Sequence, residues 1–354
     1  MSANQQNQLI HHFLIINENG DIFLDADEPA LSSFDQINEI HQNLKLTDKF
    51  ELITEFEDTL YYVESFDHPL QIIAVEFKDK GLILQSRQNT LHLADPQKWS
   101  VDEWDRFNGL TMNNAPFVLT DRAQNQLFNI SESYDDEGFV LAGQYISTPP
   151  YFIDSADIAK ESFWSQIYQT EDSPGWNLKA PAEAFKDMLP RLKLPKSRIL
   201  VLGCGEGHDA AFFAEAGHVV TAVDFSKEAI ARAKKNYGHI DKIHFHEANI
   251  FHLPQDWNQS FDLVVEHTCF CAIPPDQRNE AVRLWRRMLH EEGQFMGVFF
   301  TMEKRSGAPY GATEWELRKR LQNYFQFLFW GRWRQSLPQR QGRELFVLAQ
   351  KKNI

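Results

Sequence analysis

The chain has few cysteines and no long apolar run. Its 354 residues include three cysteines, Cys204, Cys269 and Cys271. An odd number, with two of them one residue apart, fits neither a disulfide framework nor a zinc-binding pair, so we expect reduced thiols in a cytoplasmic protein. No apolar run approaches the roughly 20 residues of a membrane helix, and the polar start MSANQQNQ is unlike a signal or transit peptide. The sequence therefore predicts no membrane segment and no secretion.

Basic residues are scarce in the first part of the chain. The whole chain carries a net charge of −15, and residues 1–150 hold 25 acids but only 8 bases, whereas residues 151–354 hold 25 acids and 27 bases. A surface this acidic repels phosphate backbones, which argues against a nucleic-acid partner. The excess charge serves solubility or attracts a basic protein partner, and the sequence leaves both interpretations open.

Residues 1–150 have the pattern of a separate, strand-rich α+β domain of unknown role. Residues 12–25 predict two strands joined by a hairpin turn at Asn19-Gly20. Helices are predicted over residues 31–44 and at a capping box formed by Ser100 and Glu103. Thr148-Pro149-Pro150 predicts a linker. Further strands are predicted over residues 50–57, 59–66, 70–77, 81–86, 116–120, 126–130 and 139–146.

The pattern changes after residue 150 to alternating strands and helices. Such alternation predicts an α/β domain over residues 151–354, with a mostly parallel, doubly wound sheet covered by helices on both faces. The last strand, residues 344–352, is predicted to be antiparallel. The expected strands cover residues 198–202, 218–224, 242–248, 261–267 and 293–300, and the expected helices include residues 226–237 and 277–289.

A glycine cluster follows the first of these strands. Gly203, Gly205 and Gly207 let the backbone turn sharply and approach a ligand, and Asp224, 19 residues beyond Gly205, can accept hydrogen bonds from both ribose hydroxyls. A dinucleotide site expects a third glycine where His208 stands. Asp209 in the first helical turn would also oppose a pyrophosphate. The loop therefore favours S-adenosylmethionine, which carries no phosphate.

With these residues in view, residues 160–354 resemble the class I S-adenosylmethionine-dependent methyltransferases, and within them the thiopurine S-methyltransferase superfamily. Besides the glycine loop, the resemblance is carried by FWSQIYQTEDSPGW at 163–176, FCAIPPDQR at 270–278 and SGAPYGATEWEL at 306–317. It implies a seven-stranded methyltransferase sheet. The sequence departs from the pattern at Val201, where many methyltransferases have an acid, and at Tyr168, where some relatives have Trp. Residues 1–150 lie outside the resemblance.

The resemblance also implies which residues form the site. The implied cofactor residues are Trp164, Tyr168 and Trp176 as walls, Gly203, Gly205 and Gly207 as the loop, Asp224 and Phe225 at the ribose, Asn249 and Ile250 at the adenine, and Glu266 with His267 on the far side. Phe270 and Tyr310 are candidates for the acceptor pocket, with core packing as the alternative for both. No residues have the spacing of a metal site.

The implied activity is in-line transfer of a methyl group to a small-molecule acceptor, a thiol or another soft nucleophile. A thiolate needs no dedicated base when its pKa lies near neutrality, and no base paired with an orienting acid is evident. His267 is open to a role as a base or as a binding or packing residue. The alternatives are methylation of halide, selenium or tellurium species, and a non-catalytic cofactor-binding regulator whose first domain binds a protein.

Overall fold

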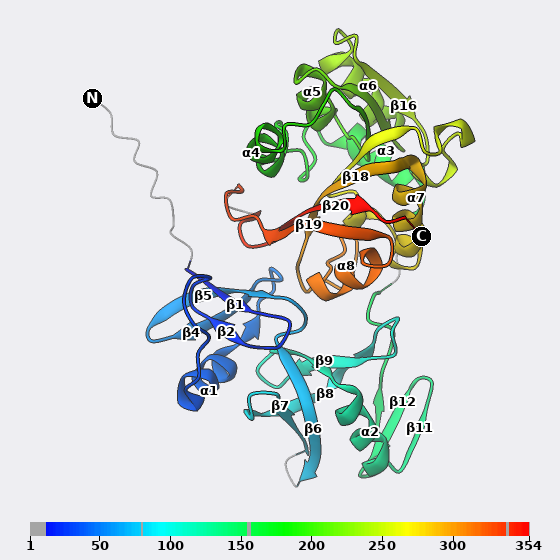
Figure 1. Cartoon of the computed structure of the whole chain (residues 1–354). Helices are drawn as coiled ribbons and strands as arrows, with labels where there is room; N and C mark the ends of the chain where they lie inside the picture. Colours follow the sequence, from blue (N-terminus) through cyan, green and yellow to red (C-terminus); the bar gives the residue numbers. More distant parts are fainter. Residues whose placement is uncertain (1–11, 79–80, 154–156, 338–339, 354) are drawn as a thin grey trace. The chain divides into compact units, whose positions relative to one another are not determined.

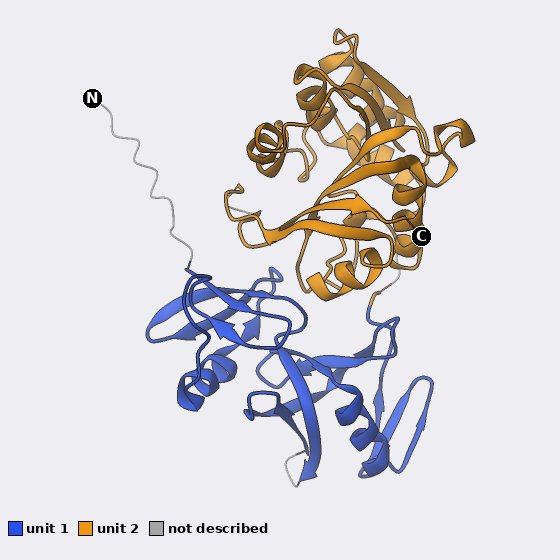
Figure 2. Cartoon of the chain, in the orientation of Figure 1, with its two compact units in different colours: residues 1–151 blue, residues 152–354 orange. Residues whose placement is uncertain are grey.

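The computed structural model describes residues 12–78, 81–153, 157–337 and 340–353, which form two compact units. Unit 1 comprises Met1–Tyr151 and unit 2 comprises Phe152–Ile354 (Figure 2). None of the helices in the described ranges is long and apolar enough to cross a membrane.

Unit 1 combines a five-stranded sheet, a closed five-stranded barrel and a three-stranded sheet (Figure 1). The sheet has the order β2-β1-β5-β4-β3, and the barrel closes in the order β10-β6-β7-β8-β9. The elements are β1 (His12–Ile16), β2 (Ile22–Phe23), α1 (Phe34–Asn43), β3 (Lys45–Leu46), β4 (Leu52–Phe56), β5 (Thr59–Ser65), β6 (Leu70–Lys78), β7 (Gly81–Ser86), β8 (Leu91–Val101), β9 (Phe107–Thr111), β10 (Pro116–Leu119), α2 (Asp121–Ile130), β11 (Ser133–Asp135), β12 (Gly138–Leu141) and β13 (Gln144–Ser147).

The hairpin and the first helix of unit 1 are confirmed. β1 and β2 pair antiparallel with Ile15 opposite Phe23, and Gly20 in the turn has a φ of 82°. A positive φ at this position is the reason that the turn needs glycine. The helix α1 lies inside the predicted range 31–44 and buries Ile37 and Ile40.

Two predictions in unit 1 are wrong because a local signal was assigned to the wrong element. The predicted strand at 126–130 is the second half of α2, whose N-cap Thr120 accepts a hydrogen bond from the Ala123 amide. Ser100 does not start a helix, because it lies in β8 and its hydroxyl bonds to Asn108 on β9. The acid that organises this turn is Asp102, which accepts hydrogen bonds from the Trp104 and Arg106 amides at 2.9 and 3.0 Å.

The predicted single strand at 139–146 is a hairpin. β12 and β13 pair antiparallel across Ala142 and Gly143, which have φ values of 51° and 75°. Two consecutive positive φ values match the twist of a two-residue hairpin turn.

A buried polar cluster joins α1 to the barrel in unit 1. The Thr90 hydroxyl lies 2.8 Å from Nδ1 of His41, 2.8 Å from Nε2 of His92 and 2.7 Å from the Ser86 hydroxyl. Burial lowers the pKa of His41 to about 3, with His92 adding to the shift, and burial lowers the pKa of His92 to about 4. Both imidazoles are therefore held neutral inside the folded unit.

Unit 2 is built on a seven-stranded sheet in the order β16-β15-β14-β17-β18-β20-β19. The first five strands in this order are parallel, and β20 runs antiparallel to both β18 and β19 (Figure 1). The predicted doubly wound sheet with an antiparallel last strand is confirmed. The elements are α3 (Glu161–Thr170), α4 (Glu183–Leu192), β14 (Arg198–Leu202), α5 (His208–Glu215), β15 (Val219–Asp224), α6 (Lys227–Tyr237), β16 (Ile243–Glu247), β17 (Phe261–His267), α7 (Arg278–Met288), β18 (Leu289–Phe300), α8 (Glu314–Leu321), β19 (Phe325–Arg332) and β20 (Glu344–Lys351), with 3-10 turns at Ile250–His252, Gln255–Trp257, Phe270–Ala272 and Pro275–Gln277.

The two faces of the sheet in unit 2 carry separate cores. Along β14, Ile199 and Val201 pack with α4 and α5, whereas Leu200 and Leu202 belong to the core of α7 and α8. Side chains alternate between faces along a strand, so a continuous apolar run such as RILVL supplies both cores. This arrangement fixes the carboxyl ends of the parallel strands at one edge, where ligands of open α/β sheets bind.

Candidate active site

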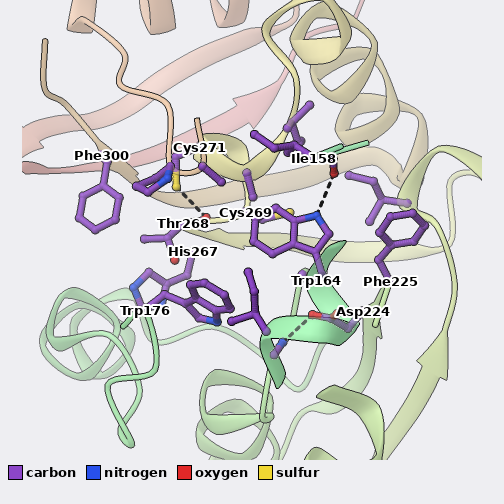
Figure 3. Close-up of a pocket in the computed structure, with 18 of the residues that line it drawn as sticks. Ile158, Trp164, Trp176, Asp224, Phe225, His267, Thr268, Cys269, Cys271 and Phe300 are labelled. Carbon is purple, nitrogen blue, oxygen red and sulfur yellow. Dashed lines mark hydrogen bonds between the residues drawn. The ribbon is translucent and has the colours of Figure 1, made fainter. Parts of the chain in front are cut away.

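A cavity of about 540 Å³ lies in unit 2 at the carboxyl ends of the parallel strands. Its size is within the range of small-molecule sites. The predicted site residues that line it are Trp164, Tyr168, Trp176, Gly203, Gly205, Asp224, Phe225, Asn249, Ile250 and His267. In Figure 3, Asp224 and Phe225 lie on one side of Trp164, and His267, Thr268 and Phe300 lie on the other.

The glycine loop leaves no room for side chains. Gly203 and Gly205 have φ values of 61° and 52°, and a Cβ on Gly203 would lie 2.7 Å from the Cys269 sulfur. Gly207, with a φ of 88°, starts α5 outside the cavity lining, and a Cβ there would lie 3.1 Å from the Phe245 ring. Positive φ and close packing together explain why glycine occupies these positions.

Asp224 ends β15 and faces the cavity (Figure 3). Its Oδ2 accepts a hydrogen bond from the Gly205 amide at 2.8 Å, and its Oδ1 accepts one from the Ser226 amide at 2.9 Å. Burial raises the pKa of Asp224, and these amides oppose the shift. A carboxylate has about four acceptor sites, so each oxygen keeps capacity for a further donor.

Aromatic side chains from α3 and the following loop form one wall. The Trp176 ring meets Trp164 and Tyr168 edge to face, with centroids 5.6 and 5.8 Å apart, and its indole N–H donates to the Tyr168 hydroxyl at 3.1 Å. The Trp164 indole donates to the Ile158 carbonyl at 2.9 Å (Figure 3). Because the polar ends are engaged, the rings present apolar faces at fixed angles.

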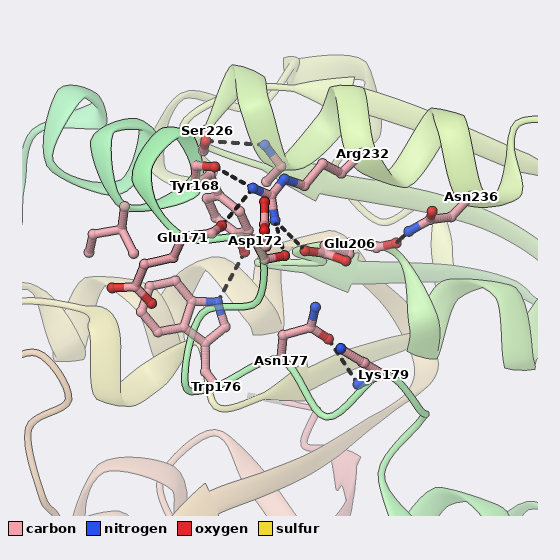
Figure 4. Close-up of polar contacts among 12 residues, drawn as sticks. Tyr168, Glu171, Asp172, Trp176, Asn177, Lys179, Glu206, Ser226, Arg232 and Asn236 are labelled. Carbon is pink, nitrogen blue, oxygen red and sulfur yellow. Dashed lines mark hydrogen bonds and ion pairs between the residues drawn. The ribbon is translucent and has the colours of Figure 1, made fainter.

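Arg232 on α6 holds this wall against the glycine loop (Figure 4). Its guanidinium donates to the carbonyls of Tyr168, Glu171 and Asp172 and to Glu206 Oε1, the last at 2.9 Å. The guanidinium also lies 5.4 Å from the centroid of the Tyr168 ring. A planar group with five donors can bind several carbonyls at once, so Arg232 fixes the end of α3 relative to the loop.

The other end of the cavity contains ionisable groups. Nδ1 of His267 lies 2.7 Å from Oδ2 of Asp209, and Arg340 approaches Nε2 of His267 at 3.4 Å. Arg340 also donates to the Trp176 carbonyl at 3.0 Å and to Glu344 at 3.2 Å. Arg340 and Arg343 both line the cavity.

The predicted acceptor residues Phe270 and Tyr310 do not line the cavity. Both are buried, and the guanidinium of Arg278 lies 4.4 Å from the centroid of the Phe270 ring and 5.8 Å from that of Tyr310. The placement of both residues agrees with core packing, which the sequence leaves open as the alternative to the acceptor pocket. Arg278, which is fully buried, is paired with Glu316 at 2.8 Å.

The match to a family model decides the identity of unit 2. The model described as thiopurine S-methyltransferase matches residues 159–350, which is more than half of the chain and contains the cavity apart from Ile158. The chain belongs to the thiopurine S-methyltransferase family. Residues 159–350 are its S-adenosylmethionine-dependent methyltransferase domain.

Curated relatives cover the same domain. A probable thiol methyltransferase 2 of Arabidopsis thaliana is 28% identical over 151 residues, which are 41% of this chain and 65% of that protein. Thiocyanate methyltransferase 1 of Arabidopsis thaliana is 27% identical, covering 42% of this chain and 66% of that protein. EEF1A lysine methyltransferase 4 of Bos taurus is 28% identical, with 48% and 72% covered. This chain thus spans just under two thirds of the two plant proteins.

Among solved structures, the chain is similar to Burkholderia thailandensis 1,6-didemethyltoxoflavin-N1-methyltransferase with bound S-adenosylhomocysteine. The two are 21% identical with a TM-score of 0.47, over 63% of this chain and 99% of that chain.

His267, which the sequence leaves open to a role as a base, has an acid partner that sequence reasoning missed. No base paired with an orienting acid is evident from the sequence, but in the structure Nδ1 of His267 lies 2.7 Å from Oδ2 of Asp209. They are 58 residues apart, and Arg340 is 73 residues beyond His267. Only the fold brings the start of α5, the end of β17 and the segment before β20 together.

Glu266 stands behind the cavity rather than in its lining. It is fully buried, and its Oε1 accepts a hydrogen bond from the Phe270 amide at 2.7 Å. Its Oε2 has no hydrogen-bond partner within the described part of the chain. Burial raises the pKa of Glu266 to about 7. The side chain of Glu266, which the resemblance places on the far side of the cofactor, thus lies behind the cavity lining, and its part in cofactor binding stays a prediction.

Glu266→Gln is expected to stabilise unit 2 at alkaline pH. The folded pKa exceeds the ordinary value of 4.5, so the native state binds the extra proton and wild-type stability falls as pH rises from about 4.5 to about 7. The difference between a pKa of 4.5 and one of about 7 corresponds to roughly 3 kcal/mol. The neutral amide lacks this penalty. Urea unfolding at pH 8 and pH 5 measures the difference, which should be large only at pH 8; equal effects at both values would contradict the assignment.

Proposed function

We propose that the protein transfers the methyl group of S-adenosylmethionine to a small thiol or another soft nucleophile. The family match over residues 159–350 carries the proposal, because the same residues enclose a cavity of about 540 Å³ at the ligand-binding edge of the sheet. The names of the two plant relatives, a thiol and a thiocyanate methyltransferase, support the acceptor class.

The cavity residues fit the cofactor. Gly203 and Gly205 line the cavity without side chains, so a ligand could approach their backbone, and the carboxylate of Asp224 has acceptor capacity left for ribose hydroxyls. Asn249 and Ile250 line the same cavity and would hold the adenine. We assign the aromatic wall of Trp164 and Trp176 to the sulfonium, which aromatic faces attract by roughly 0.5–2 kcal/mol.

The bound cofactor supplies a methyl group that is already activated on a sulfonium. The chain's task is therefore to orient the acceptor and exclude water, and positioning alone is worth effective molarities on the order of 10⁵–10⁸ M. The rigid wall of Trp164 and Trp176 and the loop tied to Arg232 provide that positioning.

Anionic acceptors such as thiocyanate are a second candidate. Arg340 and Arg343 line the cavity together with His267, and no acid lies among the lining residues other than Asp224 and Glu171. Cations beside the acceptor end favour a negatively charged nucleophile.

Asp224→Ala is expected to weaken binding of S-adenosylmethionine at least about tenfold, because each hydrogen bond to a charged group is worth about 1.5–3 kcal/mol. Calorimetry measures the affinity, with circular dichroism as the test of folding. Asp241→Ala, at an exposed position, is the matched control. Unchanged affinity in the Asp224 variant would refute the ribose assignment.

Turnover tests the activity itself. Formation of S-adenosylhomocysteine is followed with a panel of thiols, thiocyanate and iodide. We expect turnover with at least one thiol. Tight cofactor binding without turnover of any acceptor would overturn the proposal in favour of a cofactor-binding regulator.

A further inference from the structure

His267 is built into the cavity as one half of a buried acid–imidazole pair. It ends β17 and lines the cavity, and its Nδ1 lies 2.7 Å from Oδ2 of Asp209. Asp209, in the first turn of α5, is fixed in turn by the Ala182 amide, which donates to Oδ1 at 2.9 Å. A carboxylate accepts hydrogen bonds but does not donate them, so the Nδ1 of a neutral His267 carries the hydrogen.

The second ring nitrogen is left with its lone pair. Nε2 lies 3.4 Å from Arg340, and a guanidinium donates hydrogen bonds only. A contact of this length is weak, so the S–H group of a methyl acceptor in the cavity can compete with Arg340 for the Nε2 lone pair. The tautomer imposed by Asp209 is thus the one in which Nε2 can take a proton.

We propose that His267 removes the proton from a thiol acceptor and that Asp209 positions it for this step, an inference that rests on the proposed function. The S–H bond breaks, its electron pair stays on sulfur, and the proton forms an N–H bond at Nε2. The cavity then holds a thiolate beside an imidazolium. The proton leaves to water after methyl transfer, which restores the neutral ring.

The charges around His267 support the ion pair. The groups facing it are Asp209 from α5, Glu344 from β20, Arg340 from the segment before β20, and Glu266, its neighbour on β17. Burial lowers the pKa of His267, but Asp209 and Glu344 outweigh burial and Arg340, and the pKa is raised overall. The imidazolium is therefore stabilised, while Arg340 lies next to the thiolate.

Proton removal by His267 can raise the rate only for methyl acceptors that carry a proton. A free thiol has a pKa of about 8.5, so it is mostly protonated at neutral pH, whereas thiocyanate has no proton to lose. A positioned base contributes typically 10²–10⁴-fold. A residue that merely shapes the cavity would affect both acceptors alike, so the comparison of the two separates a base from a structural residue.

The test compares kcat/KM for 2-mercaptoethanol and thiocyanate in wild type, His267→Gln and Asp209→Asn. We expect the His267 variant to lose at least about 100-fold with the thiol and less than about threefold with thiocyanate. Asp209→Asn keeps an oxygen for the Ala182 amide but presents an N–H to Nδ1, which forces the wrong tautomer. We expect the same selective loss in this variant. His244→Gln, at an exposed position on β16, should change neither value.

A spectroscopic readout does not depend on turnover. Thiophenol is added to the complex with S-adenosylhomocysteine at a pH where the free thiol is protonated. We expect ultraviolet absorption of the thiolate in wild type and its loss in His267→Gln. Calorimetry with S-adenosylhomocysteine confirms that each variant keeps its cofactor site.

The outcomes separate this inference from the proposed function. Equal losses for thiol and thiocyanate, or no thiolate absorption in wild type, would overturn the role of His267 while leaving methyl transfer standing. No turnover of any acceptor by the wild type would overturn the proposed function itself.

Discussion

Glu316→Ala is expected to lower the free energy of unfolding of unit 2 by about 3–5 kcal/mol, the usual cost of removing one partner of a buried ion pair. The Glu316 carboxylate lies 2.8 Å from Arg278 and 2.9 Å from Arg320, whose side chains are 0% and 1% exposed. Without it, two buried guanidinium groups lose their shared counter-charge. Denaturant unfolding measures the change.

The control is an ion pair at the surface of the same unit. Lys186 and Glu183 lie 2.5 Å apart, but their side chains are 36% and 40% exposed, so Lys186→Ala should cost less than about 1 kcal/mol. An effect of Glu316→Ala as small as that of the control would show that Arg278 and Arg320 do not depend on the carboxylate.

Phe270 and Tyr310, the predicted acceptor residues, lie beside Arg278, which is paired with Glu316. Both belong to segments that carry the family resemblance, and the structure shows these segments meeting around the guanidinium of Arg278. Arg278 also donates to the Gly311 carbonyl at 3.1 Å. A family pattern identifies the residues that the fold requires, but it does not separate packing residues from ligand residues.

Most of unit 2 could be predicted because its signals are local. The apolar runs RILVL and HVVTAVD became β14 and β15, and Thr313 caps α8 by accepting a hydrogen bond from the Glu316 amide at 3.1 Å. In unit 1 the same method failed at α2, because the apolar side chains of residues 126–130 fit either period. The closure of the barrel depends on strand pairing, which no short sequence window records.

In the site, too, local sequence signals revealed some residues, whereas contacts between distant segments were not predicted. The glycine loop and Asp224 lie within one strand–helix–strand unit, so their spacing revealed them, although their role in binding remains a prediction. The contact of His267 with Asp209 and Arg340 joins three distant segments. From the sequence, Asp209 is only an acid in the first turn of a helix, whereas in the structure it accepts a hydrogen bond from the Ala182 amide and contacts Nδ1 of His267.

Unit 1 is expected to lose about 4 kcal/mol of stability between pH 7.5 and pH 5, because His41 and His92 are buried as neutral rings. Their folded pKa values of about 3 and about 4 lie below the unfolded value of 6.5. The stability is therefore complete above pH 6.5 and falls as the unfolded state takes up two protons, at about 1.4 kcal/mol per proton and pH unit. Urea unfolding at the two pH values, compared with the variant His41→Gln/His92→Gln, isolates this contribution.

The double variant isolates the contribution of the pair because it lacks both buried rings. His12 is an exposed histidine of the same unit, so His12→Gln should retain the wild-type pH profile, whereas the double variant should have a flatter one. If the double variant does not fold, nuclear magnetic resonance of the wild-type rings gives the answer directly. Neither His41 nor His92 should titrate between pH 8 and pH 5, since protonation would place charge beside the shared Thr90 hydroxyl, away from water. Titration of either ring near 6.5 would contradict the neutral, buried pair.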